Sequence, residues 1–182
     1  MMYEMKQVCK LKLQGLSDTD IKEKVIDENI FQYKKKSSLK RSFPYILKRV
    51  NILDDKLRNM MVQEPFEVVK VINLYSILKT DQLFYEFMNE VVKEAFDKGE
   101  KELERKNVNV FFTYKAEQSE FVANLAESTV KRLKSAYMKV LIEVGIVKDL
   151  RSRELHQLLI DEQVRKHLES IGDKQFVEVM GE

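Results

Sequence analysis

Glycine and proline are scarce in this chain, and this scarcity constrains its fold more than any other feature. Among 182 residues there are only five Gly and two Pro. A protein built from many short strands requires more turn-forming residues than this. Leu, Lys, Glu and Met, which are abundant here, are good helix formers. The sequence therefore predicts a mainly α-helical protein, folded as a compact helical bundle.

Two successive segments are the best candidates for the core of this bundle. Residues 65–79, PFEVVKVINLYSILK, are apolar on nearly every side, which is typical of a helix at the centre of a bundle. The next segment restarts at Thr80 and carries a regular apolar stripe that ends near Gly99. In residues 107–115, NVNVFFTYK, apolar side chains alternate with others, and this period of two predicts a short strand.

Charge and composition divide the chain into three parts. Residues 1–64 carry 14 basic and 9 acidic side chains, residues 65–118 carry 8 and 10, and residues 119–182 carry 10 and 11. We therefore expect an N-terminal basic part, a central part with the core helices and the extended segment, and a C-terminal part, joined in one compact unit. The excess positive charge belongs to the first part.

That positive charge is concentrated between Asn29 and Leu53, in NIFQYKKKSSLKRSFPYILKRVNIL, which contains no acidic residue. Such a local excess is expected of a surface that meets a polyanion. From Leu39 onward, apolar side chains recur at the spacing of one helical face, so the other face is free to bind. The candidate nucleic-acid-binding residues are Lys34, Lys35, Lys36, Ser38, Lys40, Arg41, Tyr45, Lys48 and Arg49.

Pro44 leaves two structures open for this stretch, because a proline inside a helix lacks the N–H that would bond four residues back. Either one kinked helix runs from Ser38 to Ile52, or Ser42 caps a shorter helix with Pro44 in its first turn. We favour the first alternative, since Leu39 then keeps the apolar stripe in phase. With the helix expected before it, this one would form a helix-turn-helix-like arrangement.

A second, weaker group of basic residues is expected in the C-terminal part. A long helix from about Ala126 to Val144 should stop at Gly145. A β-branched pair and a basic turn follow, in the order found at the end of a winged-helix module. The secondary nucleic-acid-binding candidates are Arg132, Lys139, Arg151 and Arg153.

Motifs of catalysis and metal binding are absent from the sequence. His156 and His167 are the only histidines, and Cys9 has no second thiol with which to share a zinc ion. No Gly-rich phosphate loop or nucleophile elbow is present. We therefore expect a non-enzymatic protein with no catalytic residue, cofactor, metal or small-molecule substrate. Without a membrane-length apolar run or a signal peptide, we expect it to be cytoplasmic and to have no membrane partner.

The order of these features resembles a known family. The stretches IDENIFQYKKKSSLKRSFPYILKRVNIL, INLYSILKTDQLFYEFMNEVV, NVFFTYKAE and STVKRLKSAYMKVLIEVGIV are similar to the BrxA proteins of BREX phage-defence systems. The resemblance implies a small, mainly α-helical protein with helix-turn-helix-like and winged-helix-like parts, similar to the antitermination factor NusB, that binds DNA. It carries over to the basic positions of the helix-turn-helix-like segment: Lys36, Ser38, Lys40, Arg41, Lys48 and Arg49.

The leading expectation is therefore a DNA-binding accessory protein that engages double-stranded DNA mainly through phosphates. Such contacts carry no sequence information, so binding should be weakly specific. Two alternatives stay open at this point. The basic face would dock an acidic protein partner, such as another BREX component, or it would bind RNA in the manner of NusB.

Overall fold

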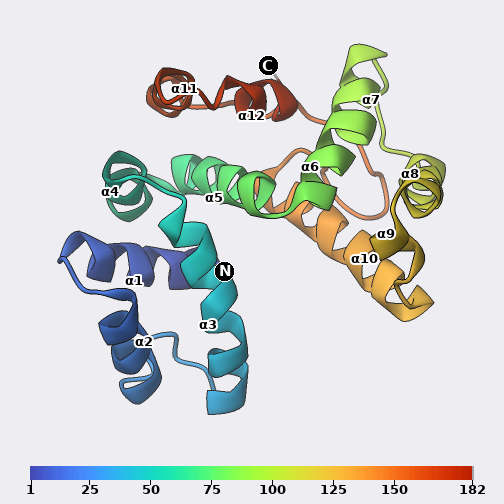
Figure 1. Cartoon of the computed structure of the whole chain (residues 1–182). Helices are drawn as coiled ribbons and strands as arrows, with labels where there is room; N and C mark the ends of the chain where they lie inside the picture. Colours follow the sequence, from blue (N-terminus) through green and yellow to red (C-terminus); the bar gives the residue numbers. More distant parts are fainter. Residues whose placement is uncertain (182) are drawn as a thin grey trace. The chain divides into compact units, whose positions relative to one another are not determined.

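The computed structural model describes residues 1–181, and its regular secondary structure over these residues is helical (Figure 1), which confirms the mainly α prediction. The first five helices are α1 (Met2–Leu13), α2 (Asp18–Asp27), α3 (Lys36–Asn51), α4 (Asp55–Gln63) and α5 (Phe66–Thr80). The others are α6 (Gln82–Phe87), the π-helix η1 (Met88–Lys93), α7 (Glu94–Asp97), α8 (Arg105–Gln118), α9 (Glu120–Ala123), α10 (Glu127–Val144), α11 (Glu162–Ser170) and α12 (Lys174–Val179).

Packing divides the chain into two compact units, residues 1–80 and the residues from 81 onward. Helix α5 belongs to the first unit because it packs against α4, α3 and α1. Charge and composition instead placed boundaries after residues 64 and 118. The boundary given by packing coincides with neither of them, since the apolar residues of α5 interact with the N-terminal helices regardless of local charge.

The first unit is built around α1, which packs against α3 and α4. Met5, Val8 and Cys9 of α1 are fully buried. Burial raises the pKa of the Cys9 thiol to about 12, so this cysteine is neutral and acts as a small apolar side chain. Helix α5 is buried on nearly every side, as its sequence predicts.

The second unit contains a cluster of aromatic side chains from three helical segments. The Tyr137 ring of α10 lies 4.8 Å from that of Phe84, 5.4 Å from that of Phe87 and 5.9 Å from that of Phe112. Beside it, Lys115 Nζ lies 2.9 Å from a carboxylate oxygen of Glu86 and 2.6 Å from one of Glu90. Burial lowers the pKa of Lys115, but its hydrogen bonds to these carboxylates outweigh burial and raise it.

The strand predicted for residues 107–115 is wrong, because these residues lie within α8. The alternation of apolar residues is coincidental, since Val110 and Tyr114 are exposed. The buried residues instead follow the spacing of a helix, and they are Val108, Phe111, Phe112 and Lys115.

Helix α10 ends at Gly145, as predicted, where a φ of +87° favours glycine. Ile146 and Val147 follow and are buried. Val147 forms an isolated antiparallel bridge with Leu155, and Glu102 forms another with Glu154. Within the described residues these bridges are the only β structure after α10, so the winged-helix-like description stays a prediction.

Candidate nucleic-acid interface

The basic stretch forms one continuous helix, α3, which contains Pro44 at its centre. Leu39, Phe43, Ile46 and Val50 are buried along its inner face, as the apolar stripe predicts. Pro44 is exposed on the outer face. The Lys40 carbonyl, which Pro44 leaves without a helical donor, can bond to water on this outer face. A single helix through Pro44, as in the first alternative, is therefore confirmed, and it runs from Lys36 to Asn51 instead of from Ser38 to Ile52.

The segment before α3 is held in place by side chains of α1 and of its own turn. Asn29 donates from Nδ2 to the Tyr33 carbonyl at 3.0 Å and accepts from the Tyr33 N–H at 3.1 Å. The Tyr33 hydroxyl donates to Glu4 at 2.9 Å. Phe31 is buried, and the centre of its ring lies 6.4 Å from the centre of the Phe43 ring. The chain therefore enters α3 from an ordered position.

This connection spans residues 28–35. It is longer than the three- or four-residue turn of a typical helix-turn-helix. The helix-turn-helix-like description of α2 and α3 therefore also stays a prediction.

The N-terminus of α3 lacks the groups that usually stabilise this end of a helix. Helix α2 begins at a capping box of Ser17 and Asp20, which the sequence predicts, and Asp54 caps α4 by accepting from the Leu57 N–H at 2.9 Å. In contrast, the N-cap of α3 is Lys35, which makes no capping hydrogen bond, and the first turn has no acidic residue. Cations are unfavourable beside the positive end of the helix dipole.

Five exposed cations gather here, and we call their side chains the α3 surface: Lys34, Lys35, Lys36, Lys40 and Arg41. Within residues 1–181, no hydrogen bond or ion pair engages any of these five side chains. Several other cations of the same unit are paired, as in the ion pairs of Lys24 with Glu28 and of Lys70 with Glu67. The positive field of the first unit is therefore least compensated at this surface.

The other predicted binding residues are placed differently. Tyr45 is 64% exposed on the outer face of α3. Lys48 is exposed but donates from Nζ to the Thr80 carbonyl at 3.1 Å, so it stabilises the end of α5. Arg49 and Ser38 are half-buried, whereas the neighbouring Ser37 is exposed. The Ser37 hydroxyl is therefore better placed than the Ser38 hydroxyl to contact a ligand. A helical projection at about 100° per residue puts residue 37 on the outer face, so the sequence carried a signal for it.

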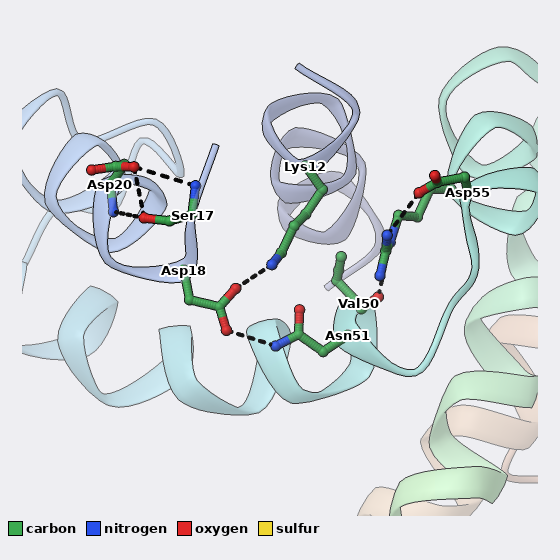
Figure 2. A network of polar contacts seen from close by, with 8 residues as sticks. Lys12, Ser17, Asp18, Asp20, Val50, Asn51 and Asp55 are labelled. Atoms are coloured by element: carbon green, nitrogen blue, oxygen red, sulfur yellow. Dashed lines mark hydrogen bonds and ion pairs between the residues drawn. The ribbon is translucent and has the colours of Figure 1, made fainter. Parts of the chain in front are cut away.

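A polar network fixes the opposite end of α3 (Figure 2). Asp18 of α2 lies between Lys12 of α1, with which it forms an ion pair, and Asn51 of α3, whose Nδ2 donates to it at 2.9 Å. Hydrogen bonds from Lys12 and then from Asn51 lower the pKa of Asp18. Arg58 donates from Nε to the Val50 carbonyl at 3.4 Å and pairs with Asp55. Helix α3 is thereby anchored at the end away from its unpaired cations.

Replacing Lys35 with Asp should stabilise the protein by about 1 kcal/mol, because Asp at this N-cap can accept a hydrogen bond from the free N–H groups of the first turn. The backbone of Lys35 already has the extended conformation of an N-cap, with φ of −121° and ψ of 120°. Urea denaturation measures the change. Lys35→Ala, which removes the charge without adding a cap, is the matched control, and an equal gain from both variants would contradict the explanation.

The secondary candidates differ in their exposure and in their contacts. Arg132 and Lys139 are exposed on α10, and Arg151 is exposed in the turn that follows it. Arg153 is half-buried and donates from Nη1 to the Leu103 carbonyl at 3.3 Å. Burial, and next the charge of Arg105, lowers the pKa of Arg153. Arg153 thus links its turn to the segment before α8.

Among residues 1–181, no three His, Cys, Asp or Glu side chains are grouped so that they could hold a metal ion. None of the helices in this range has the length and apolar character needed to span a membrane.

Comparison with known proteins identifies related sequences over nearly the whole chain. The sequence model of the BrxA family matches residues 1–172. The BREX protein BrxA of Bacillus cereus (strain H3081.97) is 40% identical over 178 residues, which cover 97% of this chain and 89% of that protein. The BREX protein BrxA of Escherichia coli O9:H4 (strain HS) is 19% identical over 177 residues, which cover 97% of this chain and 83% of that protein.

A solved structure shares the fold. The crystal structure of an uncharacterized protein from Magnetospirillum magneticum matches with a TM-score of 0.85 at 20% sequence identity, covering 99% of this chain and 92% of that one. At this identity the likeness concerns the fold alone.

Proposed function

The chain belongs to the BrxA family of BREX phage-defence systems, and from this premise we propose that it is a non-enzymatic accessory protein that binds double-stranded DNA. The observation that carries the proposal is the α3 surface, where five exposed cations without an acidic partner surround the start of a helix. A surface of this kind binds a polyanion because each phosphate that it neutralises releases counterions.

Phosphates, not bases, are the proposed targets of the α3 surface. Lys34, Lys35 and Lys36 lie at the very start of α3, where free backbone N–H groups and the helix dipole also attract anions. Phosphate contacts fix the position of a protein on a duplex but do not read its sequence. Binding is therefore weakly specific, and it weakens steeply as salt concentration rises.

The setting of this activity belongs to the same proposal. Membership of the BrxA family supports a place beside other BREX components, with which the protein acts in the cytoplasm. In that setting the protein binds DNA and helps to position the other BREX components, and those components carry out the chemistry.

A competition titration tests the proposal. The protein is titrated into a fluorescent 20-base-pair duplex at two salt concentrations, with unlabelled duplex, single-stranded DNA or an RNA hairpin as competitor. The duplex should compete most strongly, and its affinity should fall sharply at the higher salt concentration. Stronger competition by the RNA hairpin would favour RNA as the ligand, and salt-independent binding would contradict a phosphate-based interface.

A further inference from the structure

A second stretch without acidic residues lies in the other unit, on α10. Residues 128–142 contain four basic side chains and no acidic one. One of the four, Lys134, is engaged with the protein itself: its Nζ donates to Asn109 at 2.9 Å and lies 5.4 Å from the centre of the Phe112 ring. The remaining three are exposed, and they are Lys131, Arg132 and Lys139.

These three cations lie on one face of the helix. At about 100° per residue, they fall within an arc of about 100° together with two exposed serines. We call this face the α10 surface: Ser128, Lys131, Arg132, Ser135 and Lys139. With a rise of about 1.5 Å per residue, it extends for about 16 Å, which is comparable to the spacing of several successive phosphates on one DNA strand.

The cations of the α10 surface are available to an external anion. Within residues 1–181, no hydrogen bond or ion pair engages the side chains of Lys131 and Arg132. Lys139 lies 3.8 Å from Glu143, and the two side chains are 77% and 39% exposed. An ion pair this long and this exposed to solvent is weak, so a phosphate can replace it.

The opposite face of α10 fixes the orientation of this surface. Tyr137, Met138, Leu141 and Val144 are buried, and Tyr137 lies within the aromatic cluster of the second unit. Because α10 has 18 residues and a buried inner face, the α10 surface is presented on a rigid element of its own unit. No residue of α3 contributes to the α10 surface.

We propose that the α10 surface is a second phosphate-binding surface for duplex DNA, so that each compact unit of the chain contributes one surface. This inference rests on the proposed function, because the ligand is the same. It adds Lys131 to the binding residues, and it excludes Arg153, whose guanidinium is bonded to the Leu103 carbonyl. Two weak surfaces on one chain strengthen binding to DNA that can engage both.

The test replaces Lys131 and Arg132 with Gln, both in the wild-type chain and in the variant Lys35→Gln/Arg41→Gln. Loss of two phosphate contacts should lower the slope of log affinity against log salt concentration by about 1.8, which corresponds to about 60-fold at 0.1 M salt. The loss of affinity should be fully visible in the Lys35→Gln/Arg41→Gln background, because the α10 surface accounts for a larger share of the affinity that remains there. Circular dichroism and thermal unfolding check that the exposed substitutions leave the fold intact.

The control variant is Lys166→Gln/Lys174→Gln, which removes two exposed positive charges from the same unit. These lysines pair with Glu162 at 2.7 Å and Glu178 at 3.1 Å, so no phosphate contact should be lost. If Lys131→Gln/Arg132→Gln binds like its parent in both backgrounds, or no worse than the control, the inference is wrong. The proposed function is tested separately: duplex binding that is unchanged by substitutions in the α3 surface would count against the proposed function and not against the α10 surface.

Discussion

The variant Lys35→Gln/Arg41→Gln should bind duplex DNA about 60-fold more weakly than the wild-type chain at 0.1 M salt. The estimate follows from two phosphate contacts, each worth a slope of about 0.9 in log affinity against log salt concentration. Both side chains belong to the α3 surface, and neither has a partner within residues 1–181 whose loss would disturb the fold. Fluorescence anisotropy with a short labelled duplex measures the change.

Lys10→Gln/Lys56→Gln is the matched control, since it removes the same charge from exposed positions of the same unit. Lys56 follows the C-terminal end of α3, which is about 15 Å along the helix from Arg41 and farther from the other cations of the α3 surface. Lys10 lies near the end of α1, two residues before Lys12 in the sequence, and Lys12 belongs to the network in Figure 2. An equal loss of affinity in the control would show that net charge, and not the α3 surface, determines binding.

Replacing Phe43 with Ala should lower the free energy of unfolding by about 3–5 kcal/mol, because it removes a buried ring and leaves a cavity. Phe43 is 2% exposed and packs near Phe31, which is itself buried in the segment that leads into α3. The midpoint of urea denaturation, followed by circular dichroism, measures the loss.

Phe43→Leu keeps most of the buried volume and should cost less than about 1.5 kcal/mol. If Phe43→Ala costs as little as Phe43→Leu, the inner face of α3 is not docked as described. Neither variant alters a cation of the α3 surface. The pair therefore tests how α3 is docked without changing the charge of that surface.

Signals from neighbouring residues made much of the fold predictable. The Ser17 and Asp20 capping box marks the start of α2, and Gly145 marks the end of α10. The uniformly apolar character of residues 65–79 identifies α5 as a buried helix. These features depend on residues close in sequence, so local patterns are sufficient to find them.

The error at residues 107–115 shows where local patterns fail. A period of two in Val108, Val110, Phe112 and Tyr114 predicts a strand, but Val110 and Tyr114 are exposed. The buried residues follow the period of a helix instead. The helical pattern prevails because Phe111 and Phe112 pack in the aromatic cluster with α6 and α10, which forms only in the folded chain.

The sequence identifies the basic stretch, but it does not show which cations of the stretch are engaged with the protein itself. The absence of acidic residues from 29 to 53 identifies the stretch. It does not reveal that Lys48 bonds to Thr80, or that Arg153 bonds to Leu103, because these partners are 32 and 50 residues away in sequence. Only the folded structure separates cations that stabilise the protein from cations that remain available to a ligand.

The salt dependence of duplex binding tests the central claim most directly. If all five cations of the α3 surface contact phosphates, the slope of log affinity against log salt concentration should be about −4.5 or steeper in the wild-type chain. A variant with Gln at Lys34, Lys35, Lys36, Lys40 and Arg41 should lose about 4.5 from that slope. A wild-type slope near zero, or the same slope in the two proteins, would contradict the assignment of DNA binding to this surface.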